Sequence, residues 1–215
     1  MDAALVEIVE RGGRIARQVV ALEGPVCAGK TTVAAGLGSG GARVVPEYLD
    51  VPGAGIRVGF DAPAAGDGLR RLRLLLELEH CRAMQLPSAG SVVLDRSVFT
   101  LLAYEAGLAA LSLPHVLADA VREVVAAVDR RAVALPGRVV FLDCSAASCR
   151  ERAVTAGMRT PPFLFDPRFR DGFRRLFCRL ERVVPGTVLF TDADRPVAEV
   201  VKQVRDDVSA YLGCR

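Results

Sequence analysis

The sequence predicts an α/β fold in which helices cover both faces of a parallel sheet. Short apolar runs alternate with helical segments along the chain, and these runs are nearly continuous instead of alternating with polar residues. Continuous apolar strands are typical of parallel sheets buried on both faces. A glycine-rich segment lies between the first run and a helix, and ligands of such sheets bind beyond the carboxyl ends of the strands. The resulting expectation is a three-layer α/β sandwich.

Composition is consistent with one globular domain. The chain has 215 residues, of which 51% are hydrophobic, and we expect a single domain over 1–215. Its apolar runs stay below the roughly 18 residues needed to span a bilayer. The N-terminus has acidic residues and no basic, apolar leader. We therefore expect a cytoplasmic protein that does not bind a membrane.

Charge and cysteine spacing exclude two further classes. The net charge of +3 is too small to argue for nucleic acid, and we expect no nucleic-acid partner. The six cysteines form no CxxC pair, so the spacing of a zinc site is absent.

The apolar and helical patterns alternate in a regular order. We expect strands at 18–23, 43–46, 91–95, 138–143 and 187–191, and helices at 3–11, 30–37, 69–86, 97–106, 114–132, 171–183 and 196–212, with one more helix starting at 145. Residues 50–68, rich in Gly, Pro and Ala, and residues 157–168, which contain three prolines, are predicted to be loops. Gly24, Glu47, Asp95 and Asp143 then lie at or just past strand ends, on one edge of the sheet.

Residues 24–31 read GPVCAGKT and fit the pattern GxxxxGK[ST] of a phosphate-binding P-loop, between a predicted strand and a predicted helix. Backbone N–H groups of such a loop surround phosphate, and the helix N-terminus adds a positive dipole end. We expect Lys30 to bridge the β- and γ-phosphates of ATP and the Thr31 hydroxyl to bind Mg²⁺. The expected ATP-binding residues of this segment are Gly24, Pro25, Val26, Cys27, Ala28, Gly29, Lys30, Thr31 and Thr32.

Asp95, Arg96 and Ser97 follow the strand VVL. A carboxylate at a strand end beside a P-loop can bind Mg²⁺, and an adjacent arginine can bind a reacting anionic oxygen. The alternative is a helix cap formed by Asp95 beside a solvated Arg96. We predict Thr31 and Asp95 as the metal ligands and Arg96 as catalytic.

Together these motifs resemble the superfamily of deoxynucleoside kinases and thymidylate kinases, over about residues 18–195. The loop reads EGPVCAGKTT, similar to EGNIAAGKST of deoxynucleoside kinases, and DRSVFT at 95–100 is similar to their ERSVYS. Thymidylate kinases usually carry Asp where this chain has Val26. The resemblance implies a P-loop kinase fold, and it leaves a homodimer open.

The resemblance also implies roles on the acceptor side. Glu47 matches the carboxylate that takes the proton from the acceptor hydroxyl, and Tyr48 departs from the family, which commonly has Pro there. Arg82 looks like a helix arginine that organises the acceptor site, and a solvated helix face is the rival explanation. The expected acceptor-binding residues are Glu47, Tyr48, Phe60, Arg82 and Arg96. Phe99 and Tyr104 are further aromatic candidates, and loop 52–68 departs from the family.

A small lid is implied at about residues 150–168. Arg152 aligns best with the arginines that close over ATP, and it is predicted to be catalytic. Ala156 stands where the family often has a second lid arginine, and Arg159 is the substitute we expect to bind ATP. For Arg150, a basic helix end at the surface is the alternative explanation. Residues 192–194 match the region that borders adenine.

We therefore expect an enzyme that uses ATP and Mg²⁺ to phosphorylate a small-molecule hydroxyl, with a nucleoside favoured. A nucleoside monophosphate kinase comes second, and a kinase of an antibiotic or other specialised metabolite third. A regulatory P-loop NTPase is the main alternative of another class, but the chain lacks DxxG after a strand and NKxD. A binding module without catalysis would not need Glu47 or Asp95.

Overall fold

A five-stranded parallel sheet forms the centre of the protein, as seen in a computed structural model that describes residues 1–12, 18–48 and 67–212. The strands, in the order β2-β3-β1-β4-β5 across the sheet, are Arg43–Val45 (β2), Val92–Asp95 (β3), Val19–Glu23 (β1), Arg138–Asp143 (β4) and Val188–Asp192 (β5). Ala21 of the central strand lies opposite Leu94 on one side and Val139 on the other. All five predicted strands are confirmed.

In the part of the chain that the structure describes, eight helices surround this sheet. They are Asp2–Gly12 (α1), Lys30–Gly38 (α2), Gly68–Met84 (α3), Val98–Ala110 (α4), Leu117–Asp129 (α5), Ala146–Thr155 (α6), Pro167–Val183 (α7) and Val197–Leu212 (α8), and a 3₁₀ turn, η2, spans Pro162–Phe165. Within the described residues, no helix combines the length and apolar character required to cross a bilayer.

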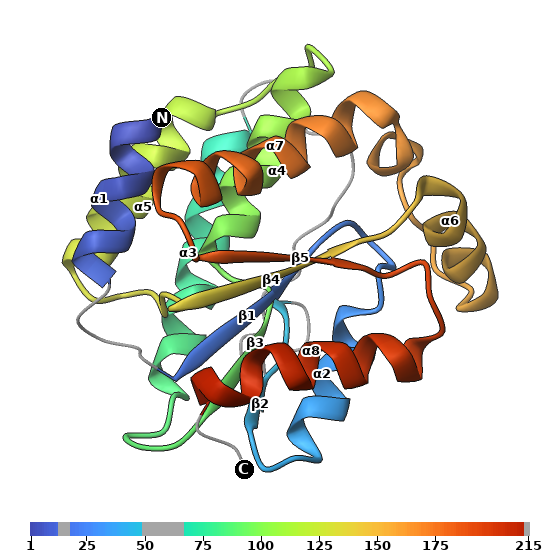
Figure 1. Ribbon diagram of the computed structural model, residues 1–215. Coiled ribbons are helices and arrows are strands. Elements are labelled where there is room, and N and C mark those ends of the chain that lie inside the picture. Colours follow the sequence, from blue (N-terminus) through green and yellow to red (C-terminus); the bar gives the residue numbers. More distant parts are fainter. Residues whose placement is uncertain (13–17, 49–66, 213–215) are drawn as a thin grey trace.

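The helices lie on both faces of the sheet, as predicted. Helices α2 and α8 cover one face, and α1, α3, α4, α5 and α7 lie on the other (Figure 1). Side chains of β1 alternate between two cores: Val19 and Ala21 join the first, and Val20 and Leu22 join the second. Because successive strand residues point to opposite faces, an apolar residue is needed at every position. This explains the continuous apolar run and confirms the predicted three-layer α/β sandwich.

The predicted start of the helix at 171 was wrong, because α7 begins at Pro167. The Asp166 side chain accepts a hydrogen bond from the backbone N–H of Arg168 and so caps the helix. Proline is favourable in the first helical turn, because a backbone N–H at that position would have no acceptor within the helix. The predicted loop at 157–168 also contains η2. Prolines therefore begin helical turns here, where we expected them to interrupt helical structure.

Helices α4 and α7 approach each other closely at two glycines. A Cβ on Gly107 would lie 2.6 Å from the Phe169 ring, and one on Gly172 would lie 2.7 Å from the carbonyl oxygen of Ala106. Larger residues would therefore push the helices apart. This close packing fixes Phe169 and Phe173 of α7 beside α4, where they line the cavity described below.

Candidate active site

The segment between β1 and α2 has the backbone geometry of a phosphate-binding loop. Gly24 has φ +135°, and a Cβ there would lie 2.5 Å from the carbonyl oxygen of Leu142. Gly29 has φ +95°, in the left-handed region that favours glycine. The N-terminal N–H groups of α2 follow directly, and with the helix dipole they favour bound phosphate. The predicted motif therefore lies in the strand–loop–helix context that it requires.

The Lys30 ammonium lies inside this loop. Its Nζ donates hydrogen bonds to the carbonyl oxygens of Pro25 at 2.7 Å and Gly24 at 3.3 Å. Burial, reinforced by the charge of Arg96 and opposed by that of Asp95, lowers the pKa of Lys30 to about 8. An anion bound in the loop would favour the charged form of Lys30.

Other loop residues take several positions. Val26 lines a cavity beside the loop, and Cys27 Sγ lies 3.7 Å from Met158 Sδ. The Ala28 carbonyl accepts a hydrogen bond from Arg152, and Thr32 is exposed in the first turn of α2.

Thr31 and Asp95 come together at the end of β3. Thr31 Oγ1 donates a hydrogen bond to Asp95 Oδ2 at 2.6 Å. Asp95 Oδ1 is buried and has no hydrogen-bond partner among the described residues. Because a buried carboxylate oxygen needs a positive or donating partner, and Mg²⁺ prefers oxygen ligands, this pair fits a magnesium ion.

A tight corner follows Asp95 and orients the next residue. Arg96 has φ +70°, which is unusual for a side chain with a Cβ. Buried Glu23 stabilises the corner by accepting hydrogen bonds from the Ser97 N–H at 2.8 Å, from Ser97 Oγ at 2.6 Å and from Thr100 Oγ1. Burial raises the pKa of Glu23, although the hydroxyl hydrogen bonds oppose the shift. The predicted capping by Asp95 is wrong: Ser97 caps α4.

Arg96 pairs with the predicted base. Its Nε donates to Glu47 Oε2 at 2.8 Å, and both side chains are mostly buried. Burial alone would raise the pKa of Glu47, but the charge and hydrogen bond of Arg96 outweigh it, so the pKa is lowered. Glu47 is therefore an ionised carboxylate at neutral pH, as a general base must be.

Arg82 does not contact the cavity. The guanidinium is fully buried and donates to the carbonyl oxygens of Pro46 (2.9 Å), Asp95 (2.8 Å) and Arg96 (2.8 Å). It also pairs with Glu79 at 2.8 Å. The expectation of direct acceptor binding is thus replaced by a positioning role, because Arg82 joins the ends of β2 and β3. The alternative of a solvated Arg82 is excluded.

Arginines of the predicted lid have three different surroundings. Arg152 donates to the carbonyl oxygens of Ala28 at 3.2 Å and Ala193 at 2.8 Å, so it links the phosphate loop to the segment after β5. Arg159 lines the cavity. Arg150 instead packs over the ring of Phe165 and donates to the carbonyl oxygen of the same residue.

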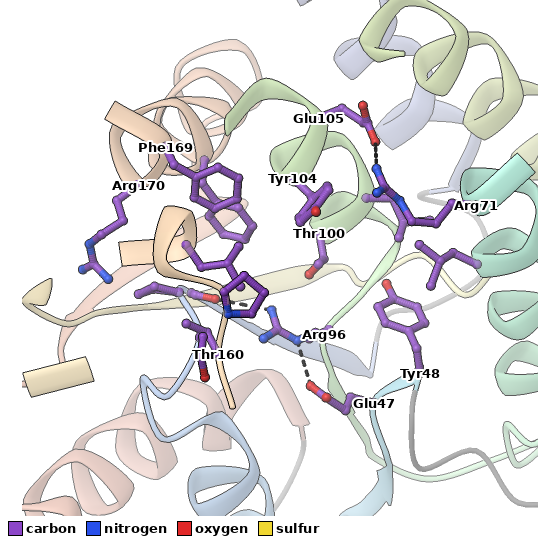
Figure 2. A pocket seen from close by; sticks show the side chains of 18 of the residues that line it. Glu47, Tyr48, Arg71, Arg96, Thr100, Tyr104, Glu105, Thr160, Phe169 and Arg170 are labelled. Atoms are coloured by element: carbon purple, nitrogen blue, oxygen red, sulfur yellow. Dashed lines mark hydrogen bonds and ion pairs between the residues drawn. The ribbon is translucent and has the colours of Figure 1, made fainter. Parts of the chain in front are cut away.

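A cavity of about 210 Å³ opens beside the loop and contains the predicted base. Figure 2 shows Glu47 and Tyr48 on one side, Phe169 and Arg170 on the other side, Thr100 and Tyr104 between them, and Glu105 above. Its lining comprises Gly24, Pro25, Val26, Glu47, Tyr48, Arg71, Leu72, Leu75, Arg96, Thr100, Leu101, Tyr104, Glu105, Met158, Arg159, Thr160, Pro161, Leu164, Phe169, Arg170 and Phe173. The phosphate loop, the predicted base Glu47 and Arg159 of the predicted lid thus line one cavity.

The aromatic residues predicted for the acceptor site lie in different places. Tyr48 and Tyr104 line the cavity, and the Tyr48 hydroxyl donates to the carbonyl oxygen of Ser97 at 2.5 Å. Phe99 is instead a core residue. Phe60, with most of loop 52–68, lies outside the described residues.

Sequence reasoning missed several lining residues: Arg71, Thr100, Glu105, Phe169, Arg170 and Phe173. They come from α3, α4 and α7, and only Thr100 lies in a motif, as the last residue of DRSVFT at 95–100. The available signal was the position of Thr100 and Glu105 on the helix that follows Asp95, Arg96 and Ser97.

These features define a P-loop α/β fold with a phosphate loop, a strand-end carboxylate and a cavity beside the loop. Solved structures with this fold include deoxyadenosine kinase from M. mycoides. Its complex with dATP superposes with a TM-score of 0.68 at 13% sequence identity, covering 89% of this chain and 99% of that one. The complex with the products dCMP and dCDP superposes with a TM-score of 0.67 at 13% identity, covering 89% of this chain and 98% of that one. The complex with dCTP superposes with a TM-score of 0.63 at 13% identity, covering 89% of this chain and 99% of that one.

No family model matches the sequence, and no curated protein matches it closely enough to be reported as a relative. The superpositions over 89% of this chain show that the fold is like that of deoxynucleoside kinases. They confirm the predicted resemblance at the level of the fold.

Proposed function

We propose that this protein transfers the γ-phosphoryl group of ATP to a hydroxyl group of a small molecule, with a nucleoside as the favoured acceptor. The main observation is that Glu47 and Arg96 line the same cavity as Gly24, Pro25 and Val26 of the phosphate loop. An acceptor in that cavity would lie between a carboxylate base and the phosphate-binding loop. This arrangement supports transfer to a bound molecule more than it supports a regulatory NTPase.

The donor side follows from the loop. Lys30 and the N–H groups at the start of α2 would bind the phosphates, and Arg152 would offset charge that develops on the transferred group. Thr31 and Asp95 would hold Mg²⁺, which when bound would neutralise phosphate charge. The deoxyadenosine kinase of similar fold has been solved with dATP and dCTP, which supports a nucleoside triphosphate donor here.

The acceptor side follows from the Glu47–Arg96 ion pair. Ionised Glu47 would accept the proton of the acceptor hydroxyl as the new P–O bond forms. Arg96 would hold Glu47 in orientation and keep it ionised, because the pair lowers the pKa of that carboxyl. The guanidinium also lies 3.5 Å from the carbonyl oxygen of Gly24, where the donor and the acceptor would meet.

A nucleoside monophosphate kinase remains the second candidate, and the arginines of the cavity favour it. Arg159 and Arg170 line the cavity with Arg96, and such a group could bind an acceptor phosphate. Since an acceptor phosphate is ionised near neutral pH, that reaction would need no general base. Kinases of specialised metabolites would use the same Glu47 with a different acceptor.

A screen for phosphorylated product tests the proposal. The wild-type protein is incubated with Mg·ATP and separate sets of nucleosides, nucleoside monophosphates and nucleoside- or aminoglycoside-type antibiotics, and products are identified by mass spectrometry. We expect phosphorylated nucleosides, and their loss in Lys30→Ala, which removes the charge at the phosphates. Phosphorylation confined to monophosphates would select the second candidate. ATP hydrolysis with no acceptor product across the screen would overturn the proposal.

A further inference from the structure

A buried ion pair lies at the inner end of the cavity, away from the phosphate loop. Arg71 of α3 and Glu105 of α4 both line the cavity, and Arg71 Nη2 donates to Glu105 Oε1 at 3.1 Å. Only 12% of the Arg71 side chain and 3% of the Glu105 side chain are exposed. Figure 2 shows the pair beside Tyr104, whereas Glu47 and Arg96 lie at the other end. None of the motifs in the sequence includes these two residues.

The guanidinium of Arg71 is fixed from two directions. Glu105 Oε2 accepts the backbone N–H of Val116 at 2.8 Å, so both carboxylate oxygens are engaged and the carboxylate cannot turn freely. The Arg71 guanidinium also lies over the Tyr104 ring, 4.9 Å from its centroid. A cation that is stacked on a ring and paired with a fixed carboxylate keeps one orientation. Glu105 therefore acts as a positioning residue for Arg71.

The pair leaves hydrogen-bond donors for a ligand. A guanidinium has five N–H donors in a planar fork. Among the described residues, Arg71 donates to Glu105, and it does so through Nη2. The remaining donors belong to a side chain that lines the cavity, where an uncharged group with adjacent acceptors would satisfy them.

Charge decides against an anion at this end. Glu105 compensates the positive charge of Arg71, so the pair is neutral as a unit, and a phosphate or carboxylate would meet the Glu105 carboxylate beside it. The surrounding walls are apolar and aromatic, with Leu72 and Leu75 on α3 and Phe169 and Phe173 on α7. Such walls suit a flat, uncharged ring.

We propose that Arg71 determines acceptor specificity by binding a planar heterocycle that presents two adjacent hydrogen-bond acceptors. Cytosine offers these as O2 and N3, and guanine as O6 and N7. Uracil and thymine carry an N–H between their two carbonyl groups, and this hydrogen would point at the guanidinium. The inference rests on the proposed nucleoside kinase activity and names the bases that it favours.

The first experiment uses the wild-type protein only. Binding of deoxycytidine, deoxyuridine, deoxyguanosine and 7-deazadeoxyguanosine is measured by calorimetry, and phosphorylation of each by Mg·ATP is measured in parallel. We expect deoxycytidine to exceed deoxyuridine by about tenfold or more in affinity and in kcat/KM, since a bidentate base contact contributes discrimination of this order. We expect 7-deazadeoxyguanosine, which lacks N7, to fall below deoxyguanosine by a similar factor in both quantities. Equal values within each pair would overturn the inference.

Matched variants assign the effect to Arg71. Arg71→Gln removes the fork, and the deoxycytidine-to-deoxyuridine ratio should fall toward one. Glu105→Gln keeps the shape but removes the charge that orients the fork, and the ratio should fall partly. Arg73→Gln is the control, because Arg73 lies on the same helix and pairs with Glu123 at 2.8 Å, with 60% of its side chain exposed. Its ratio should match the wild type.

The outcomes separate this inference from the proposed function. Preferential binding of deoxycytidine without phosphorylation would leave the inference standing and overturn the kinase. Phosphorylation of all nucleosides with equal kcat/KM would leave the kinase standing and overturn the inference. Should Arg71→Gln lower both kcat/KM values equally while the ratio persists, Arg71 would be a structural residue and the inference would be wrong. Thermal unfolding of each variant identifies any that fail to fold, and the wild-type pairs remain decisive in that case.

Discussion

Thr31 and Asp95 lie 64 residues apart in sequence, yet the Thr31 hydroxyl donates to the Asp95 carboxylate at 2.6 Å. The contact joins the first turn of α2 to the end of β3. Because β1 and β3 pair in parallel, their carboxyl ends lie side by side, and α2 begins shortly after the end of β1. The second oxygen of Asp95 is buried without a partner among the described residues. A cation beside this pair would satisfy that oxygen.

The metal prediction follows from this contact. Asp95→Asn removes the charge while keeping the shape, so the concentration of Mg²⁺ needed for half-maximal activity should rise by about tenfold or more, as hydrogen bonds and charge contacts to buried carboxylates are worth about 1.5–3 kcal/mol. EDTA should abolish turnover of the wild type. Asp206→Asn is the control, because Asp206 is an exposed carboxylate on α8 that pairs with Lys202 and does not line the cavity. Unchanged Mg²⁺ dependence in Asp95→Asn would show that Asp95 is not a ligand.

The lowered pKa of Lys30 predicts proton uptake when phosphate binds. In the free protein this pKa is about 8, below the ordinary value of 10.5, so at pH 8 about half of the Lys30 side chains are neutral. An anion in the loop favours the charged form and raises the pKa, so about half a proton should be taken up per ATP bound at pH 8. Calorimetry in two buffers of different ionisation enthalpy measures this number. Lys30→Met should take up none, and an equal uptake by this variant would assign the proton to another group.

Arg152 should act on the transition state more than on ATP binding. Charge grows on the transferred group during reaction, so Arg152→Ala should lower kcat by about tenfold or more, with a smaller rise in the KM for ATP. Its hydrogen bonds to Ala28 and Ala193 suggest the competing result, in which the arginine only holds the loop. In that case KM would rise while kcat stays unchanged. Arg150→Ala is the control, since Arg150 contacts Phe165 instead of the loop.

Strands and the phosphate loop could be predicted because their signals are local. Each residue of β1 is apolar or buried, and GxxxxGK[ST] fixes the loop by its own glycines. Arg71 and Glu105 could not be predicted as a pair, because they belong to different helices and meet only after α3 and α4 pack. Likewise, Glu79 and Arg82 have the spacing of an exposed helix pair, and only tertiary packing shows that both are fully buried.

Burial of Arg82 predicts a large stability effect. Arg82→Met leaves Glu79 buried without its partner and removes donors from three backbone carbonyls, so the free energy of unfolding should fall by about 3–5 kcal/mol. Urea unfolding measures this. Arg73→Met breaks an exposed pair and should cost at most about 1 kcal/mol. Equal losses for the two variants would contradict the assignment of Arg82 as a buried positioning residue.

The last prediction concerns the base, and it separates a hydroxyl kinase from a monophosphate kinase. Glu47→Gln keeps size and hydrogen bonding but removes the basic oxygen, and loss of a general base costs about 10²–10⁴ in rate. Affinity for ATP should barely change, because the Glu47 side chain binds Arg96 on the acceptor side of the cavity. The wild type should also keep its activity as the pH falls to the ordinary pKa of a glutamate, because the pKa of Glu47 is lowered and its carboxylate is still ionised at that pH.

The measurement is kcat for Glu47→Gln beside its dissociation constant for ATP, with the pH profile of the wild type. Arg96→Lys adds a second check, since a lysine keeps a charge near Glu47 but loses the geometry of the Nε hydrogen bond. It should shift the acid limb of the profile toward higher pH, as the carboxylate loses its hydrogen-bonded partner and its pKa rises. Near-normal kcat in Glu47→Gln, with ATP binding intact, would defeat the base assignment and move the monophosphate kinase to first place.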